Sequence, residues 1–366
     1  MITHGVAVGP AKHGRWPALD GMRAVAVVAV MLGHLFLSRL QNGQVGVDVF
    51  FVLSGFLITW LLIAEHDRGN GVSFRAFYAR RALRLFPALA AVLIVVTLVV
   101  ITWSRLSGFK SATLTELPWA ILYVGNYNFV DLGRSDLPSH TWSLAVEEQF
   151  YLIWPVICVT ILKYKLNKIQ VAESLLTVAL IEAIARWIYL RHLNGDVQVS
   201  YHALFLRSDG LLVGCAIAFA FASGLGEHLA GPMFNTLVKL AALAGVVLFL
   251  GVVWGEPQVL TNQWVYIPLT VMASAAVLTS LLVAPFGPLE AMLSSRPVVW
   301  IGRRSYGVYL WHWPIFRVFS TVVYRDKMEQ AAIIFSEFTL TFVLVAASWR
   351  FVEKPALRLK ERFQRT

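Results

Sequence analysis

Long apolar runs follow one another along most of this 366-residue chain, separated by short polar segments. Each run holds roughly 18 or more residues, enough for an α-helix to cross about 30 Å of hydrocarbon. Strands that cross a membrane alternate apolar and polar positions, whereas these runs are continuous, so the pattern predicts helices. The predicted spans cover residues 18–39, 45–65, 86–103, 146–162, 169–190, 203–222, 236–254, 263–284, 303–324 and 328–350.

One further apolar stretch, residues 117–130, is shorter and contains Pro118, Gly125, Asn126 and Asn128. Such a segment favours an interfacial or re-entrant position over a full crossing. Leaving it out gives an even number of spans, which places both termini on the same side. The predicted fold is therefore all-α, a polytopic integral membrane protein with about ten transmembrane helices.

Composition and charge agree with this fold. Hydrophobic residues make up 58% of the chain and charged residues 14%, which is too apolar for a soluble surface. With the N-terminus inside, about 19 of the 31 Lys and Arg residues fall in inner segments. For a protein of the cell inner (cytoplasmic) membrane, the excess predicts that both termini are cytoplasmic. We attribute the net charge of +10 to this orientation and to contact with membrane lipids, with no nucleic acid as partner.

The domain organisation follows from the same pattern. Residues 1–17 are predicted to be a cytoplasmic N-terminal segment, 18–354 the transmembrane domain and 355–366 a basic cytoplasmic tail. Residues 1–17 lack the apolar core of a signal peptide, so the first span is expected to be retained as an anchor. Cys158 and Cys215 lie in apolar runs without spaced partners, which predicts neither a disulfide framework nor a metal site.

Arg23 and His34 lie inside the first predicted span, where ionisable side chains are costly and typical of functional sites. Eleven residues along a helix bring the two to within about 20° of the same face and about 16 Å apart. This separation suits an extended ligand whose phosphate binds arginine and whose thioester reaches histidine, the general base for a hydroxyl. The structural alternative is that Arg23 snorkels and His34 bonds a neighbouring helix.

A basic amphipathic segment, residues 74–87, separates the second and third spans. On a helix, Arg81 and Arg84 share a face and could hold phosphates bidentately, with Arg80 beside them. The alternative interpretation is an anchor for lipid headgroups.

Two adjacent acids, Glu147 and Glu148, follow Trp142 where the chain enters the fourth span. Neighbours on a helix point about 100° apart, so both cannot face one pocket. We expect one of them to orient or charge-stabilise His34 while the other pairs elsewhere. Stabilisation of a helix N-terminus by acids is the alternative.

The second span contains Asp48 near its outer end, followed by Ser54 and Gly55. Small residues such as Ser54 and Gly55 allow a neighbouring helix to approach closely, so a packing role is expected for them. No nucleophile-elbow pattern surrounds Ser54, and no serine acyl-enzyme is predicted.

Two later groups are weaker candidates. Arg207 and Asp209 could pair at the start of a span. An aromatic cluster near the C-terminus has the composition of an interfacial belt, although His312 remains a candidate site residue. The cluster comprises Tyr306, Tyr309, Trp311, His312 and Trp313.

Taken in order, these segments resemble the acyltransferase-3 family of bacterial membrane O-acyltransferases. Each segment is weak by itself, but the ordered set is specific and spans almost the whole chain. The matching segments are 19–23 with His34, 46–58, 81–84, 142–151, 207–214, 306–314 and 351–355.

The resemblance implies transfer of an acyl group from acyl-CoA to a hydroxyl of a sugar or sugar-containing acceptor such as a cell-surface polysaccharide. Acetyl is the expected acyl group. It implies no permanently bound cofactor, and acetyl-CoA is the expected donor substrate. Some members carry a fused SGNH-type esterase domain, whereas this chain is expected to be a stand-alone member. The implied site comprises His34, Arg23, Glu148 and Glu147 for catalysis, Arg23, Arg81, Arg84 and Arg80 for acyl-CoA, and Asp48, Ser54, Trp142, Tyr306, Tyr309 and His312 as acceptor or supporting residues.

Several alternatives stay open at this point. The acceptor could be a glycosylated secondary metabolite such as a macrolide, and a transporter or flippase would also place polar residues inside spans. Direct transfer to the acceptor and a covalent acyl-histidine relay are equally compatible with His34. The acyl chain length, the membrane side of transfer and a homo-oligomeric state are not determined by the sequence.

Overall fold

The computed structural model describes residues 16–35, 41–103, 107–132, 137–255, 262–322 and 325–359. Within these ranges the chain forms helices and no strand, which confirms the all-α prediction. The α-helices are α1 (Pro17–Gly33), α2 (Gly46–Glu65), α3 (Phe74–Thr102), α4 (Ser107–Ile121), α5 (Gly125–Leu132), α6 (Trp142–Lys163), α7 (Lys168–Arg191), α8 (Val197–His202), α9 (Asp209–Ala222), α10 (Leu225–His228), α11 (Pro232–Trp254), α12 (Gln263–Val283), α13 (Gly287–Leu293), α14 (Arg296–Arg303), α15 (Ser305–Phe319), α16 (Lys327–Ser348) and α17 (Lys354–Leu359). Short helical turns are η1 (Gln41–Val45), η2 (His66–Asn70), η4 (Ser139–Thr141), η5 (Leu204–Leu206) and η6 (Trp349–Glu353).

Every predicted span contains a helix. Six helical stretches of the described chain are long and apolar enough to cross a membrane, and they contain α2, α3, α6, α11, α12 and α16. The other four predicted spans contain α1, α7, α9 and α15. Of these, α9 is a shorter apolar helix of 14 residues, and α7 has 24 residues but contains Glu173, Glu182 and Arg186. The protein is thus a multi-pass membrane protein, and the number of ten crossings stays a prediction.

The surface of the bundle is apolar and its interior contains charged groups, the reverse of a soluble protein. On α3, Ile94 is 58% exposed and Leu98 56%, and similar side chains cover the outer faces of α6, α7, α11 and α16. By contrast, Arg186 and Arg207 are fully buried. This distribution fits hydrocarbon, where apolar groups face lipid and polar groups must find partners inside the protein.

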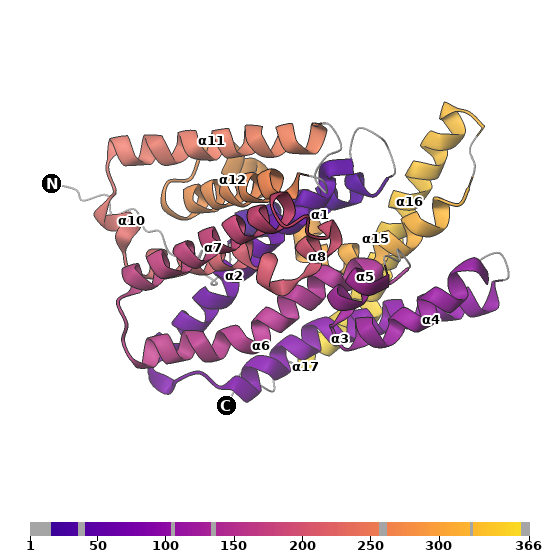
Figure 1. The fold of residues 1–366 in the computed structure, drawn as a ribbon, viewed down its shortest axis with the longest axis horizontal. Helices are drawn as coiled ribbons and strands as arrows, with labels where there is room; N and C mark the ends of the chain where they lie inside the picture. Colours follow the sequence, from indigo (N-terminus) through magenta and orange to yellow (C-terminus); the bar gives the residue numbers. More distant parts are fainter. Residues whose placement is uncertain are drawn as a thin grey trace.

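Helix α1 lies near the middle of the bundle, where it packs against α2, α12, α14 and α15 (Figure 1). Along one edge of the molecule α3 and α4 lie side by side, with α17 packed on α3 (Figure 1). The pair α11 and α12 forms the opposite edge (Figure 1). The central position of α1 gives Arg23, and His34 at its C-terminal end, access to several neighbouring helices.

The segment 117–130 forms no continuous helix. Helix α4 ends at Ile121, Tyr123 takes a positive φ of 53°, and α5 begins at Gly125. A positive φ is uncommon for a residue with a side chain and marks a sharp turn. The geometry agrees with the expectation that this stretch does not make a single full crossing.

The basic segment 74–87 is not a separate surface helix. It forms the first half of α3, which begins after Ser73, whose Oγ accepts a hydrogen bond from the Ala76 amide at 3.3 Å. The helix continues through Pro87 to Thr102. An internal proline removes one backbone hydrogen bond, a loss that neighbouring helices make tolerable in membrane spans. One rigid element therefore carries the arginines from the polar segment into the bundle.

Helices α2 and α9 cross at very close range through two glycines. A Cβ added to Gly55 would overlap the carbonyl oxygen of Leu211, and one added to Gly214 would overlap the carbonyl oxygen of Val52. Small residues at such crossings allow backbones to approach, which is a common source of helix association in membranes. The contact confirms the packing role expected for Gly55.

We expect Gly55→Ala to lower the stability of the detergent-purified protein by about 1–3 kcal/mol, because backbone atoms of α9 have to move. Gly251→Ala in α11 is the matched control, since nothing lies within 4 Å of its added Cβ. Thermal unfolding followed by circular dichroism measures both variants. Equal melting temperatures for the two would contradict the packing role.

Candidate active site

A cavity of about 170 Å³ lies among α1, α2, α3, α6 and α15. Sequence reasoning missed two of its lining residues, Tyr123 and Tyr151, because aromatic residues near a membrane interface give no specific signal. Eight of the predicted site residues line this cavity: Arg23, Ser54, Arg80, Arg81, Arg84, Glu147, Glu148 and Tyr306.

Arg81 is held by a carboxylate and an aromatic ring. Its Nε donates to both oxygens of Glu148, at 3.0 and 2.9 Å, and its Nη2 also contacts Glu148. The guanidinium carbon lies 3.5 Å from the centre of the Tyr151 ring. The neighbouring acid, Glu147, accepts a hydrogen bond from Ser54 Oγ at 2.9 Å. The charge of Arg81 is therefore already compensated within the protein.

Arg23 and Arg84 differ from Arg81. Neither makes a hydrogen bond or an ion pair with another residue in the described part of the chain, although both line the cavity. Arg80, on the same helix as Arg84, is bonded to Glu65 at 2.9 Å. Two uncompensated guanidinium groups in one cavity favour an anionic ligand, and phosphate matches their planar array of donors.

His34 is bonded to His312 at the other end of α1. Its Nδ1 lies 3.0 Å from His312 Nε2, and the two rings stack with centroids 5.2 Å apart. Trp313 packs edge-on against His34 at 4.6 Å. His312 is fully buried, whereas His34 is only partly buried. Neither histidine lines the cavity.

The expectation that Glu147 or Glu148 orients His34 is wrong. The two carboxylates bond Ser54 and Arg81, and the partner of His34 comes from α15. At the level of the two acids, α6 faces α2 and α3. The sequence correctly indicated different partners for the two acids. The expectation that both cannot face one pocket is wrong, because Glu147 and Glu148 both line the cavity.

Helices α1 and α15 connect the arginine-lined cavity with the histidine pair. Arg23 and His34 lie eleven residues apart on α1, and Tyr306 and His312 lie six residues apart on α15, a rise of about 9 Å. On α15 between them, the Tyr309 hydroxyl donates to the His140 carbonyl at 2.6 Å and contacts Ser143 Oγ at 2.7 Å.

Tyr306 itself donates to the Leu85 carbonyl at 3.0 Å. This bond joins the cavity end of α15 to α3. The predicted residues Arg23 and His34 thus lie on α1 or at its end, and Tyr306, Tyr309 and His312 lie on α15, with His140 and Ser143 as neighbours that the sequence did not single out. Their signal was present in the polar run 139–149, which precedes and opens α6.

Asp48 and Trp142 lie outside this path, beside a buried network of charges. Asp48 pairs with Arg207, and both are almost completely buried. Trp142 packs edge-on against His202, with ring centroids 4.6 Å apart. No contact between Asp48 and the cavity is present, so its role toward the acceptor stays a prediction.

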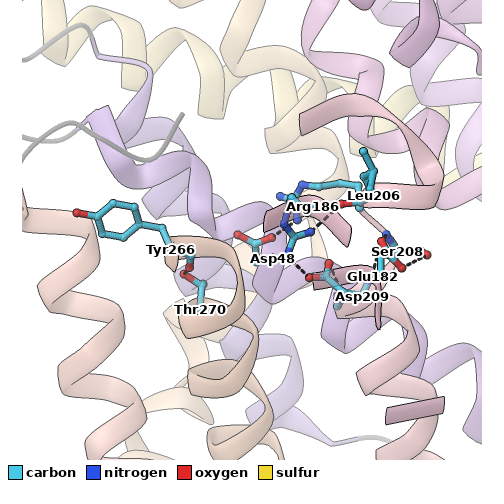
Figure 2. Close-up of polar contacts among 10 residues, drawn as sticks. Asp48, Glu182, Arg186, Leu206, Ser208, Asp209, Tyr266 and Thr270 are labelled. Carbon is cyan, nitrogen blue, oxygen red and sulfur yellow. Dashed lines mark hydrogen bonds and ion pairs between the residues drawn. The ribbon is translucent and has the colours of Figure 1, made fainter. Parts of the chain in front are cut away.

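The predicted pairing of Arg207 with Asp209 is wrong. Asp209 accepts from Arg186 Nη2 at 2.6 Å, and Figure 2 shows these two side chains pointing toward each other from α7 and α9. Residues two apart in the chain do not face each other at the start of a helix, so Arg207 and Asp209 find partners on different elements.

Glu182 completes the network. It lies one turn before Arg186 on α7, and it accepts hydrogen bonds from the Ser208 hydroxyl at 2.8 Å and from the Asp209 amide at 3.2 Å (Figure 2). These bonds satisfy free amides at the N-terminus of α9 and favour a negative charge there. Ionisable residues inside the predicted span 169–190 were the signal that could have identified Glu182 and Arg186.

Among the described residues, no group of three or more His, Cys, Asp or Glu side chains is placed to hold a metal ion. The site presents arginine, tyrosine and carboxylate side chains in the cavity and a pair of histidines outside it.

Comparison with known proteins agrees with this chemistry. A family model described as an acyltransferase domain matches residues 16–350. The chain belongs to this family, the acyltransferase-3 family. No solved structure matches the chain.

Curated relatives are similar over most of the chain. It is 30% identical to the peptidoglycan O-acetyltransferase OatA of Listeria monocytogenes over 358 residues, which cover 93% of this chain and 55% of that protein. It is 31% identical to the O-acetyltransferase OatA of Staphylococcus aureus over 353 residues, covering 93% and 57%, respectively. The Bacillus subtilis protein YrhL is 33% identical over 357 residues, covering 94% and 55%. The chain thus spans little more than half the length of these relatives.

The buried ion pair between Asp48 and Arg207 provides a test of the network. Arg207→Met alone should destabilise the protein by about 3–5 kcal/mol, because it leaves the Asp48 carboxylate buried without its counter-ion. The double variant Asp48→Leu/Arg207→Met should recover most of this loss, since Asp48 Oδ2 already lacks a partner within the described structure. Unfolding in detergent measures the stability of both variants. A double variant no more stable than Arg207→Met would show that the pair is not coupled.

Proposed function

We propose that this protein is a membrane O-acetyltransferase that transfers an acetyl group from acetyl-CoA to a hydroxyl of a cell-wall or cell-surface polysaccharide. The observation that carries the proposal is the cavity in which Arg23 and Arg84 have no counter-ion among the described residues. Arg23 belongs to the helix that presents His34 at its other end. The printed names of the relatives, peptidoglycan O-acetyltransferase and O-acetyltransferase, support acetyl as the group and a polysaccharide as the acceptor.

The donor binds through its phosphates. Arg23 and Arg84 take the phosphates of coenzyme A, because a guanidinium forms bidentate bonds with phosphate oxygens. Arg81 is engaged by Glu148, so it contributes positive potential or rearranges when the donor binds. Arg80 is close enough to line the same cavity. By the distribution of Lys and Arg, this cavity opens toward the cytoplasm, where both termini are placed.

The pantetheine arm then extends along α1 toward His34, about 16 Å from Arg23 along the helix. In direct transfer, His34 takes the proton of the acceptor hydroxyl, the oxygen bonds to the acyl carbon, the carbon–sulfur bond breaks, and the thiolate leaves and recovers the proton. In the relay variant, the imidazole attacks the acyl carbon first and the coenzyme A thiolate leaves. The acceptor hydroxyl then attacks the acyl carbon, the bond to the imidazole nitrogen breaks, and the hydroxyl proton passes through the freed imidazole to the thiolate. Both variants use the ring nitrogen of His34 that does not face His312.

A glycosylated small molecule such as a macrolide is the second acceptor class, and no feature of the described site favours it over a polysaccharide. Family membership argues against a transporter or flippase, since an acyl-CoA cavity serves neither.

Replacing His34 tests the catalytic assignment. Purified His34→Ala should still bind acetyl-CoA but release coenzyme A at least about 100-fold more slowly than wild type, because a general base contributes about 10²–10⁴-fold. The assay supplies acetyl-CoA with peptidoglycan fragments, other sugar acceptors and a glycosylated macrolide. His192→Ala, an exposed histidine at the end of α7, is the control.

Equal turnover by wild type and His34→Ala would remove His34 from the catalytic site. A wild type that binds no acyl-CoA, or never releases coenzyme A with any acceptor, would overturn the acyltransfer proposal.

The donor site is tested by Arg84→Gln and Arg23→Gln. Each should weaken binding of coenzyme A by about tenfold or more, because a charge-assisted hydrogen bond contributes about 1.5–3 kcal/mol. Arg75→Gln changes an exposed arginine of α3 that does not line the cavity and should leave binding unchanged. Isothermal titration calorimetry in detergent compares the three. A loss of the same size for Arg75→Gln would indicate general electrostatic attraction instead of a built site.

A further inference from the structure

The bond between His34 and His312 joins two imidazole nitrogens, His34 Nδ1 and His312 Nε2, at 3.0 Å. In a hydrogen bond between two neutral imidazoles, one nitrogen carries the proton and the other accepts it. The direction of this bond therefore decides which nitrogen of His34 has a free lone pair. Two directions are chemically allowed, and only one of them leaves a lone pair on His34 Nε2, as a general base that acts through this nitrogen requires.

The second nitrogen of His312 settles the direction. His312 Nδ1 lies 3.1 Å from the carbonyl oxygen of Val308, one turn earlier on α15. A carbonyl oxygen only accepts, so His312 Nδ1 must carry a proton. In a neutral ring, Nε2 of His312 is then the acceptor, and the proton in the shared bond belongs to His34 Nδ1.

Burial keeps His312 in its neutral form. Its side chain is fully buried, and the groups around it are the rings of His34, His140, Tyr309 and Phe316. None of these is a carboxylate that would stabilise an imidazolium. An unpaired charge in such surroundings is costly, which favours the uncharged ring.

We propose that His312 is a positioning residue that holds His34 in the tautomer protonated at Nδ1, so that His34 Nε2 presents its lone pair to the reacting groups. The inference rests on the proposed acetyl transfer, in which His34 removes the hydroxyl proton. Two hydrogen bonds in series, from His312 to the Val308 carbonyl and from His34 to His312, fix both the tautomer and the plane of the His34 ring. Trp313, edge-on to His34 at 4.6 Å, restricts the ring further.

The same bond strengthens during the reaction. When His34 Nε2 takes the hydroxyl proton, the ring becomes an imidazolium that still donates from Nδ1 to His312 Nε2. Hydrogen bonds from a charged donor are about twice as strong as neutral ones. An interaction that is stronger in the transition state than in the ground state raises kcat, so the effect of His312 belongs in kcat more than in KM.

Two substitutions separate this role from simple packing. His312→Phe keeps a ring of similar size but cannot accept from His34, and it should lower kcat for coenzyme A release by about 100-fold with KM for acetyl-CoA changed less than threefold. His312→Gln retains an acceptor oxygen and should keep at least about a tenth of wild-type kcat. Binding of coenzyme A, which occurs at the distant arginines, reports whether each variant is folded.

A spectroscopic measurement on the unaltered protein tests the tautomer directly. Two-bond nitrogen–proton correlations of the ¹⁵N-histidine-labelled protein in detergent distinguish Nδ1–H from Nε2–H rings, and His34→Ala identifies the signal of His34. The expected result is a neutral His34 with its proton on Nδ1 and a bare Nε2. A proton on Nε2 of His34 would overturn the proposal even if every variant lost activity.

The outcomes separate this proposal from the proposed function. If wild type turns over and His34→Ala does not, but His312→Phe retains full kcat, acetyl transfer stands and the positioning role fails. If His312→Phe and His312→Gln lose kcat equally while both bind coenzyme A, the acceptor role of His312 fails. If wild type itself neither binds nor consumes acetyl-CoA, the proposed function fails, whereas the tautomer measurement still reads the state of His34.

Discussion

The structure depends on one constraint: a polar or charged side chain inside an apolar bundle has to find its partner on another helix, because lipid supplies none. Asp48 and Arg207 meet this constraint across 159 residues of sequence, and His34 and His312 across 278. Arg186 and Asp209 do the same between α7 and α9. These contacts specify which helices are neighbours in a bundle whose remaining contacts are mostly apolar.

The same constraint makes the cavity informative. Arg81 is compensated by Glu148, and Arg80 by Glu65, as expected for cations held in a bundle. Arg23 and Arg84 line the cavity without such a partner in the described structure. Where a protein retains cations that it does not neutralise itself, a ligand of opposite charge is the simplest explanation of their energetic cost. The proposed donor site thus rests on this asymmetry among four neighbouring arginines.

Hydrophobic pattern predicted the helices well because a run of apolar residues in a membrane has only one common solution. Each predicted span contains a helix, and the break within 117–130 occurs beside the glycine and asparagines that indicated it. The sequence did not predict the full length of α3. Its first half has the pattern of a surface segment, and Pro87 indicates a helix boundary. Helix α7 is ambiguous for a different reason: Glu182 and Arg186 lower its hydropathy, although both are buried against α9.

By itself, the sequence determined what lies along one helix: Arg23 and His34 on one face of α1, the arginines of α3 one turn apart, and two acids of α6 that point to different partners. Helical periodicity fixes such relations locally. Only the tertiary structure decided the partners of these side chains. His34 bonds His312 instead of a carboxylate, and Arg207 pairs with Asp48 instead of Asp209. The partner of a side chain depends on which helices pack together and on how far each is shifted along its axis. Contacts between residues far apart in the chain, such as the Gly55–Leu211 crossing, determine this arrangement.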